Sequence, residues 1–256
     1  MRRALSLQSH LLTSAGFRHA FFTRHHGWST GAYSSLNFSA VVGDRPDAVE
    51  ENTRLGAEAL GVAAEHLCFA DQVHGCDVAI IGPEDDASSL RAQAADAVMS
   101  REPDRACAVR TADCLPLLVA DETTGAVMAI HAGWRGVEAN IVGKALRRLR
   151  EFIGGDGRLV AAIGPHISGD AFEVSEDVAA RLERISPVPG VVDKSRARPH
   201  VDLERIVRGQ LVEAAVDRSR IERVGGCTAS DSSSYFSYRR DGPRSGRHLH
   251  AIVARR

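Results

Sequence analysis

Ala129-Ile-His-Ala-Gly-Trp-Arg-Gly136 joins an apolar run to a helical pattern in the middle of this chain. The run from Ala126 to Ile130 predicts a buried strand with His131 at its end. Apolar residues then recur three or four positions apart, as on one face of an amphipathic helix: Val137, Ile141, Ala145, Leu149 and Phe152. Gly133 and Gly136 predict a turn between the two elements that uses the conformational freedom of glycine. The stretch therefore predicts a strand, a turn and a helix.

His131 has two interpretations from this stretch alone. It is either a hydrogen-bonded interior residue or a functional group, held by a rigid strand and exposed by the loop that follows. Trp134 and Arg135 beside it offer a stacking face and a cation that binds anions. The other motifs of the chain favour the functional interpretation.

Composition limits the class of protein. The 256 residues are 44% hydrophobic and 25% charged, which is typical of a globular protein with a substantial core. A formal net charge of -1 gives no overall attraction to nucleic acid or to an anionic membrane. No stretch approaches the roughly 20 apolar residues of a membrane helix, and no apolar core follows the basic start. The five cysteines form no CxxC pair, so we expect reduced thiols and a cytoplasmic protein.

Strand and helix patterns are mixed along the chain, without an internal repeat or a linker. Further strands are predicted at Leu67–Ala70, Val78–Ile81, Ala106–Val109, Leu115–Ala120, Leu159–Ile163 and Leu249–Val253, and further helices at Asp47–Leu60, Val178–Ile185 and Leu203–Leu211. Pro116 has no N–H to donate, so it predicts an edge strand or a bulge at its position. We expect one domain spanning residues 1–256.

Three residues with metal-binding side chains occur in turns at strand ends: His74, Cys114 and His131. Their separations are too wide for a zinc finger but suit a site assembled from several strands. Two imidazoles and a thiolate suit zinc, and three protein ligands leave a fourth position for water, as in catalytic sites. A cation there would keep the thiol ionised and lower the pKa of bound water to roughly 7.

A second use of the same residues needs no metal. Cys114 could act as a nucleophile with His131 as its base, the arrangement of cysteine hydrolases. The third ligand, His74, favours metal. Asp113 adjoins Cys114 and is a candidate catalytic residue for proton transfer, or alternatively a cap of the turn or a support for a ligand histidine. His166 and Glu173 are the next acid–base candidates.

Arginines are frequent in the candidate loops, where they are either anion-binding groups or solvated surface residues: Arg24, Arg135, Arg239, Arg240 and Arg247. Trp134, Phe236 and Tyr238 are candidate apolar walls for a flat base.

Five motifs occur together in order along the chain: Gln72-Val-His-Gly75, Thr111-Ala-Asp-Cys-Leu-Pro116, His131-Ala-Gly-Trp-Arg-Gly136, Ile163-Gly-Pro165 with Phe172-Glu-Val174, and Phe236-Ser-Tyr-Arg-Arg-Asp-Gly242 with Gly246-Arg247. In these motifs, from about Phe21 to the C-terminus, the chain resembles the bacterial laccase-domain family. That family is also labelled multicopper polyphenol oxidase or peptidoglycan editing factor, and its members are mostly described as zinc-dependent purine nucleoside enzymes.

The resemblance implies an α+β fold in a single domain, with two packed mixed β-sheets and outer helices in four α/β/β/α layers. It implies zinc at His74, Cys114 and His131, with copper possible under the historical label. It also implies phosphorolysis of adenosine, inosine and methylthioadenosine and deamination of adenosine. The partners would be purine nucleosides and phosphate, with these candidate substrate-binding residues: Arg24, Gln72, Arg135, Arg239 and Arg240.

Two features bear on that function. The family motif Arg-x-Gly-Gly-Val-Ser is replaced here by Arg24-His-His-Gly-Trp-Ser29, so a change in the shape of that wall and in substrate preference is expected. A multicopper oxidase needs several sites rich in HxH pairs, whereas the HxH motif of this chain, His248-Leu-His250, lies at the C-terminus, away from the three candidate ligands. The oxidase label therefore fits the sequence poorly.

Other functions remain open on the sequence. The Cys–His pair is also similar to that of the cytotoxic necrotizing factor toxins, which are cysteine deamidases. An editing hydrolase acting on a muramyl nucleotide of the cell wall is a second alternative, and a binding module without catalysis is a third.

Overall fold

The computed structural model describes residues 4 to 255, and its central strands pair into a six-stranded mixed sheet. The strand order is β12 (Ile221–Arg223), β9 (Leu159–Ile163), β7 (Leu115–Asp121), β8 (Val127–Ala132), β5 (Ala97–Ser100) and β4 (Val78–Ile81). The outer pairs β12–β9 and β5–β4 are parallel, and the central pairs are antiparallel.

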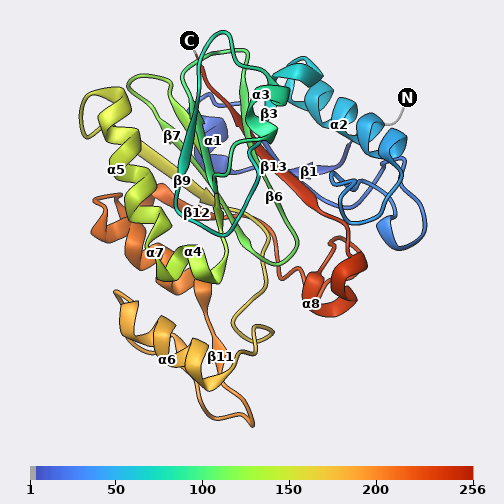
Figure 1. The fold of residues 1–256 in the computed structure, drawn as a ribbon. Coiled ribbons are helices and arrows are strands. Elements are labelled where there is room, and N and C mark those ends of the chain that lie inside the picture. The colour runs from blue at the N-terminus through green and yellow to red at the C-terminus, as the bar shows by residue number, and fades with distance from the viewer. Residues whose placement is uncertain (1–3, 256) are drawn as a thin grey trace.

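A second, five-stranded sheet packs against the first (Figure 1). Its order is β1 (Ser6–Leu7), β2 (His19–Phe22), β13 (His248–Val253), β6 (Ala106–Thr111) and β3 (Leu67–Cys68), and only β3–β6 is parallel. A separate two-stranded ribbon joins β10 (Val192–Asp193) to β11 (His200–Val201). The last strand therefore lies in the middle of a sheet that begins with the first.

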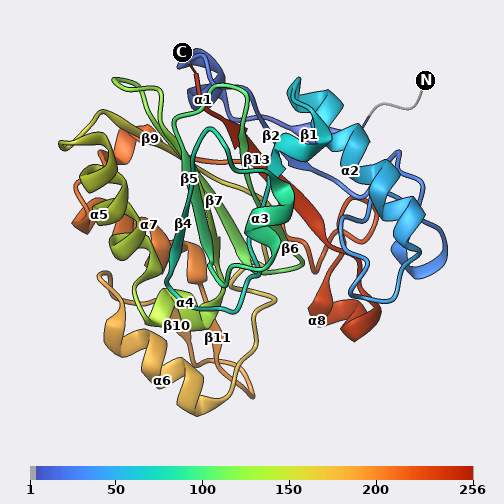
Figure 2. The same cartoon turned by 45° about the horizontal axis from the view of Figure 1, so that its top comes forward.

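Helices cover the outer faces of both sheets (Figures 1 and 2). The five-stranded sheet carries α2 (Pro46–Leu60), and the six-stranded sheet carries α4 (Trp134–Glu138), α5 (Ile141–Ile153), α6 (Glu176–Ile185) and α7 (Leu203–Glu213). Shorter elements are α1 (His10–Ser14), α3 (Ala87–Arg91), α8 (Tyr238–Asp241) and the 3-10 turns Gly31–Tyr33, Ala64–His66, Arg218–Arg220 and Gly242–Arg244. None of the helices within residues 4 to 255 is long and apolar enough to span a bilayer.

Strand alternation divides the core into three packed layers. Along β7, Leu117 faces the cluster formed with α5 and α7, whereas Leu118 faces the cluster between the two sheets. Leu249 of β13 joins the third cluster, under α2. The prediction of two packed mixed sheets with outer helices in one α+β domain is confirmed.

Two local predictions were wrong. The helical pattern after Gly136 forms two helices, because Asn140 adopts the left-handed conformation (φ 59°) and its side chain accepts from Gly143 N to start α5. The strand with Pro116 is central rather than at an edge. Pairing with β9 begins only at Leu117, so Pro116 lies where its missing N–H interrupts no ladder, while its carbonyl accepts from Gly164 N at 2.9 Å.

Candidate active site

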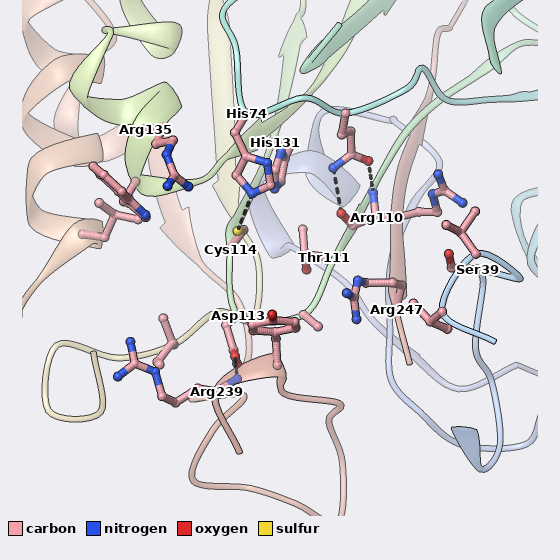
Figure 3. A pocket seen from close by; sticks show the side chains of 18 of the residues that line it. Ser39, His74, Arg110, Thr111, Asp113, Cys114, His131, Arg135, Arg239 and Arg247 are labelled. Atoms are coloured by element: carbon pink, nitrogen blue, oxygen red, sulfur yellow. Dashed lines mark hydrogen bonds between the residues drawn. The ribbon is translucent and has the colours of Figure 1, made fainter. Parts of the chain in front are cut away.

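Three turns bring His74, Cys114 and His131 together at one end of the sheets. His74 lies between β3 and β4, Cys114 between β6 and β7, and His131 near the end of β8. Their ligand atoms all lie within 4.8 Å of one another, and His74 Nε2 is 3.9 Å from Cys114 Sγ (Figure 3). The cluster runs from exposed His74 to buried His131, so one side is open to a substrate. These donors can hold a metal ion.

Asp96 supports the cluster from behind and is a residue of the site that the sequence analysis missed. It is fully buried, and its Oδ1 accepts from His131 Nδ1 at 2.7 Å and from His74 N at 2.9 Å. Its Oδ2 accepts from Gly75 N at 2.6 Å and Val73 N at 3.2 Å. The carboxylate therefore holds two ligands at once and leaves Nε2 of His131 available to a metal. The available signal was a lone carboxylate inside the apolar run at residues 94–99.

The charges of the cluster are coupled. Burial raises the pKa of the Cys114 thiol, but the positive charge of His131 and hydrogen bonds from both histidines outweigh it and lower the pKa to about 6. Burial lowers the pKa of His131, but the Cys114 thiolate and the Asp96 carboxylate outweigh it and raise the pKa to about 9. Without metal, the pair is a thiolate and an imidazolium near neutral pH, so metal binding must release the imidazolium proton.

The turns of the cluster have an unusual backbone. His74 and Asp113 have positive φ values of 62° and 88°, which L-residues seldom adopt. Gly133 has a φ of -71°, so the predicted need for conformational freedom was wrong. Space is the reason for this glycine, because a Cβ atom there would lie 2.8 Å from His74 Cδ2 and 3.3 Å from Cys114 Sγ. Gly136 likewise lies within α4, where a Cβ atom would approach Gly75 O to 3.2 Å.

Asp113 connects the cysteine turn to the C-terminal segment. Its Oδ1 accepts from Thr228 Oγ1 at 2.6 Å, and its Oδ2 accepts from Ser237 Oγ at 3.0 Å and from Arg239 N at 2.6 Å. These donors come from three places in the C-terminal region and fix the start of α8. We therefore propose that Asp113 anchors the turn, which is the second of its two predicted roles.

The cluster opens into a cavity of about 770 Å³. Its apolar walls include Trp134, Phe172 and Tyr238. Its cationic groups are Arg110, Arg135, Arg239 and Arg247, each of which lies over an aromatic ring. Arg135 lies 4.5 Å from the Trp134 centroid, and Arg239 lies 5.7 Å from that of Phe172. A cavity of this size accommodates a drug-sized ligand such as a nucleoside.

Several candidate residues lie elsewhere. Arg24 donates to Ser34 O and Ser232 O and covers the ring of Phe236, which is fully buried and forms no wall. None of residues 24–29 lines the cavity, so the altered motif there does not form the cavity surface.

Arg240, too, is absent from the lining, because its guanidinium donates to carbonyls of the chain and to Asp241. Gln72 lines the cavity, but its amide donates to Arg110 O at 2.8 Å and accepts from Arg110 N at 2.7 Å. Its side chain thus attaches the histidine turn to β6.

The remaining acid–base candidates are also outside the lining. His166 is buried, with Nδ1 at 2.8 Å from Gly164 O, and Glu173 pairs with Arg198 at 3.3 Å. The HxH pair reaches only the back of the wall, where His250 Nε2 lies 2.9 Å from Oγ1 of the lining residue Thr111.

The protein is therefore a two-sheet α+β protein with a His–Cys–His cluster that opens into a large cavity. The chain belongs to the family described as multi-copper polyphenol oxidoreductase laccase, which it matches over residues 18–255.

Curated relatives of this chain carry the name purine nucleoside phosphorylase. The protein of that name from Bacteroides thetaiotaomicron is 35% identical over 98% of this chain and 96% of its own length. Purine nucleoside phosphorylase YfiH of Escherichia coli is 35% identical over 86% of each chain. The crystal structure of YlmD from Geobacillus stearothermophilus superposes with a TM-score of 0.91, at 29% identity, over 100% of this chain and 98% of that one.

Proposed function

We propose that this protein is a zinc-dependent purine nucleoside phosphorylase that acts on adenosine, inosine and methylthioadenosine. The observation that carries the proposal is a single cavity combining a three-donor metal cluster, four guanidinium groups and aromatic walls. The names of the relatives support it. In the reaction, a phosphate oxygen bonds to C1′ of the ribose as the glycosidic bond breaks, giving a sugar 1-phosphate and a free purine.

The donors of the cluster fit zinc. A thiolate and two imidazoles are typical zinc ligands. Asp96 accepts a hydrogen bond from Nδ1 of His131, as carboxylates behind zinc-binding histidines commonly do. When bound, zinc would supply a Lewis acid at the base of the cavity. Within residues 4 to 255, this is the one cluster of three or more such donors, whereas a multicopper oxidase needs several.

The chain's own residues would bind and orient the substrates. Arg135 and Arg239 offer planar forks of N–H donors that match a phosphate. Arg239 is held in place by Glu173 O, which accepts from its Nη2 at 2.7 Å. Trp134, Phe172 and Tyr238 offer faces for the purine. Binding both reactants in one cavity would hold them in a reactive orientation, so that a bimolecular step becomes effectively unimolecular.

Adenosine deamination is a second activity that we propose for the same cavity. Three protein donors leave a metal position open, the arrangement of catalytic zinc. Adenosine and water would give inosine and ammonia, so phosphate is not needed.

A cysteine hydrolase is the alternative that one specific observation favours. Asp96, His131 and Cys114 are ordered as orienting carboxylate, base and nucleophile, and the thiol pKa is lowered. Such an enzyme could act on an amide or on a muramyl nucleotide of the cell wall, and it would need no metal.

A panel of nucleosides with and without phosphate, read by product chromatography, tests the proposal. We expect hypoxanthine and a sugar 1-phosphate from inosine only when phosphate is present, and inosine from adenosine in its absence. Cleavage of a muramyl nucleotide by metal-free protein, with no turnover of any nucleoside, would support the alternative instead.

Arg135→Ala should weaken phosphorolysis more than deamination. The arginine would bind phosphate through charge-assisted hydrogen bonds, and losing them costs about 1.5–3 kcal/mol, roughly 10- to 150-fold in phosphate-dependent kcat/KM. The measurement compares inosine phosphorolysis with adenosine deamination in one preparation. Arg147→Ala, on the exposed face of α5, is the matched control and should leave both rates unchanged. Equal losses in both reactions would assign Arg135 a structural role.

A further inference from the structure

Arg110 is a cation in the cavity wall, and the carboxylate of Asp71, which lines the same cavity, offsets its charge only in part. Among the described residues, the Arg110 side chain makes one hydrogen bond, a long one from Nη1 to Phe38 O at 3.4 Å. Its guanidinium lies 4.3 Å from the centroid of Phe69, and Arg91 lies 5.3 Å from the same centroid. Within residues 4 to 255, Arg110 forms no salt bridge. Arg110 is half-buried, and a partly desolvated charge gains stability from an anionic partner.

Arg247 adds a second cation to the same part of the cavity. Its Nη1 donates to Ser245 O at 2.7 Å and Gly246 O at 3.1 Å, and no carboxylate of the described residues pairs with it. Burial and the positive charges of Arg91 and Arg247 outweigh the negative charge of Asp71 and lower the pKa of Arg110 to about 10, so the cation is destabilised as it stands. An anion between the two guanidinium groups would offset both the cost of burying their charges and the repulsion between them.

The two arginines are separate from the proposed site of phosphate attack. In Figure 3, Arg110, Arg247 and Ser39 lie on one side of the metal-binding cluster, and Arg135 lies on the other. All of them line the same cavity. A phosphate bound at Arg135 would therefore leave Arg110 without a bound anion.

We propose that Arg110 and Arg247, with the hydroxyl of Ser39, form a second subsite that binds a phosphate group. Two guanidinium groups offer several N–H donors and two positive charges, which match the three oxygens and nearly two negative charges of a phosphate better than a carboxylate. The phosphate has two sources, the 5′-phosphate of a purine nucleotide or free orthophosphate. If a nucleotide fills the subsite, the substrate class extends from nucleosides to nucleoside monophosphates. Only the purine part of the ligand rests on the proposed function; the phosphate subsite is argued from its own residues.

Calorimetric titration of the full-length protein, as purified and in phosphate-free buffer, tests the subsite. The ligands are inosine, inosine 5′-monophosphate and orthophosphate, each added alone, so no phosphorolysis occurs. Arg110→Met keeps an apolar stem against Phe69 and removes the charge. We expect it to weaken the monophosphate by about tenfold or more and to leave inosine unchanged. Arg147→Met, on the exposed face of α5, is the control with the same change of charge and should bind as the native protein does.

The three ligands distinguish the two sources. A selective loss for the monophosphate assigns the subsite to a nucleotide. A selective loss for orthophosphate, with the monophosphate binding no better than inosine, assigns it to free phosphate. Unchanged affinity for both phosphate ligands, or equal weakening of inosine and its monophosphate, would overturn the proposal.

A second variant covers the case in which Arg110→Met does not fold. Arg110→Lys keeps a charge but loses the fork, and we expect a smaller but still selective loss. Because these titrations need no turnover, binding that depends on Arg110 in a protein without phosphorylase activity would refute the proposed function and leave the subsite standing.

Discussion

Cys114→Ser will lose its metal and, with it, turnover of nucleosides. A neutral hydroxyl is a poor replacement for a thiolate, and the two histidines, which lower the pKa of the Cys114 thiol to about 6, favour the ionised form. We expect a loss of zinc affinity larger than the roughly 10- to 100-fold that follows removal of a group behind a ligand. Elemental analysis of the purified variant and a competition titration with a chelator measure it.

Cys227→Ser is the matched control for that experiment. Cys227 is a half-buried thiol whose sulfur accepts hydrogen bonds from Ser168 N and Ser230 Oγ, and it lies outside the cavity lining. This variant should keep both metal and activity. Native zinc stoichiometry in Cys114→Ser would remove the cysteine from the metal site. If the native protein contains no metal and Cys114→Ser is nevertheless inactive, the result would favour the cysteine hydrolase.

Asp96→Asn will weaken metal binding and destabilise the fold together. The carboxylate accepts from three backbone N–H groups and from His131 Nδ1, and an amide has only one acceptor oxygen to offer them. Breaking such a buried ionic network costs about 3–5 kcal/mol, and losing the support of His131 lowers metal affinity by roughly 10- to 100-fold. Denaturant unfolding and chelator competition measure the two effects.

Asp121→Asn separates the two effects, because its environment is similar but distant. Asp121 is also fully buried, and it accepts from Thr123 N and Thr124 N in the turn between β7 and β8 and from Arg158 N just before β9. We expect it to lose stability while keeping native zinc affinity. Equal zinc affinity in both variants would show that Asp96 supports the fold alone.

Much of the fold could be predicted because apolar periodicity depends on local sequence. The strand at Val78–Ile81 and the helix ending at Leu60 occur as expected, since each has a clear pattern and the helix ends at Gly61 in the left-handed conformation. The His74, Cys114 and His131 cluster was also accessible, because each donor follows an apolar run and strand ends meet at one edge.

What could not be predicted depends on contacts between distant segments. Asp96 has no motif of its own, and its role appears only when β5 pairs with β8 and carries it beside His131. Arg24 and Arg110 each cover a buried aromatic ring, yet of the two only Arg110 lines the cavity. Which arginine reaches the cavity depends on how distant strands pair in the sheets, and the local sequence does not indicate that pairing.

Reconstitution of the metal-stripped protein tests the central claim most directly. The protein is treated with a chelator, dialysed, and assayed for sugar 1-phosphate formed from inosine and phosphate before and after one equivalent of zinc. We predict negligible product without metal and recovery in proportion to the zinc bound. Phosphorolysis at the native rate by fully metal-free protein would contradict the account.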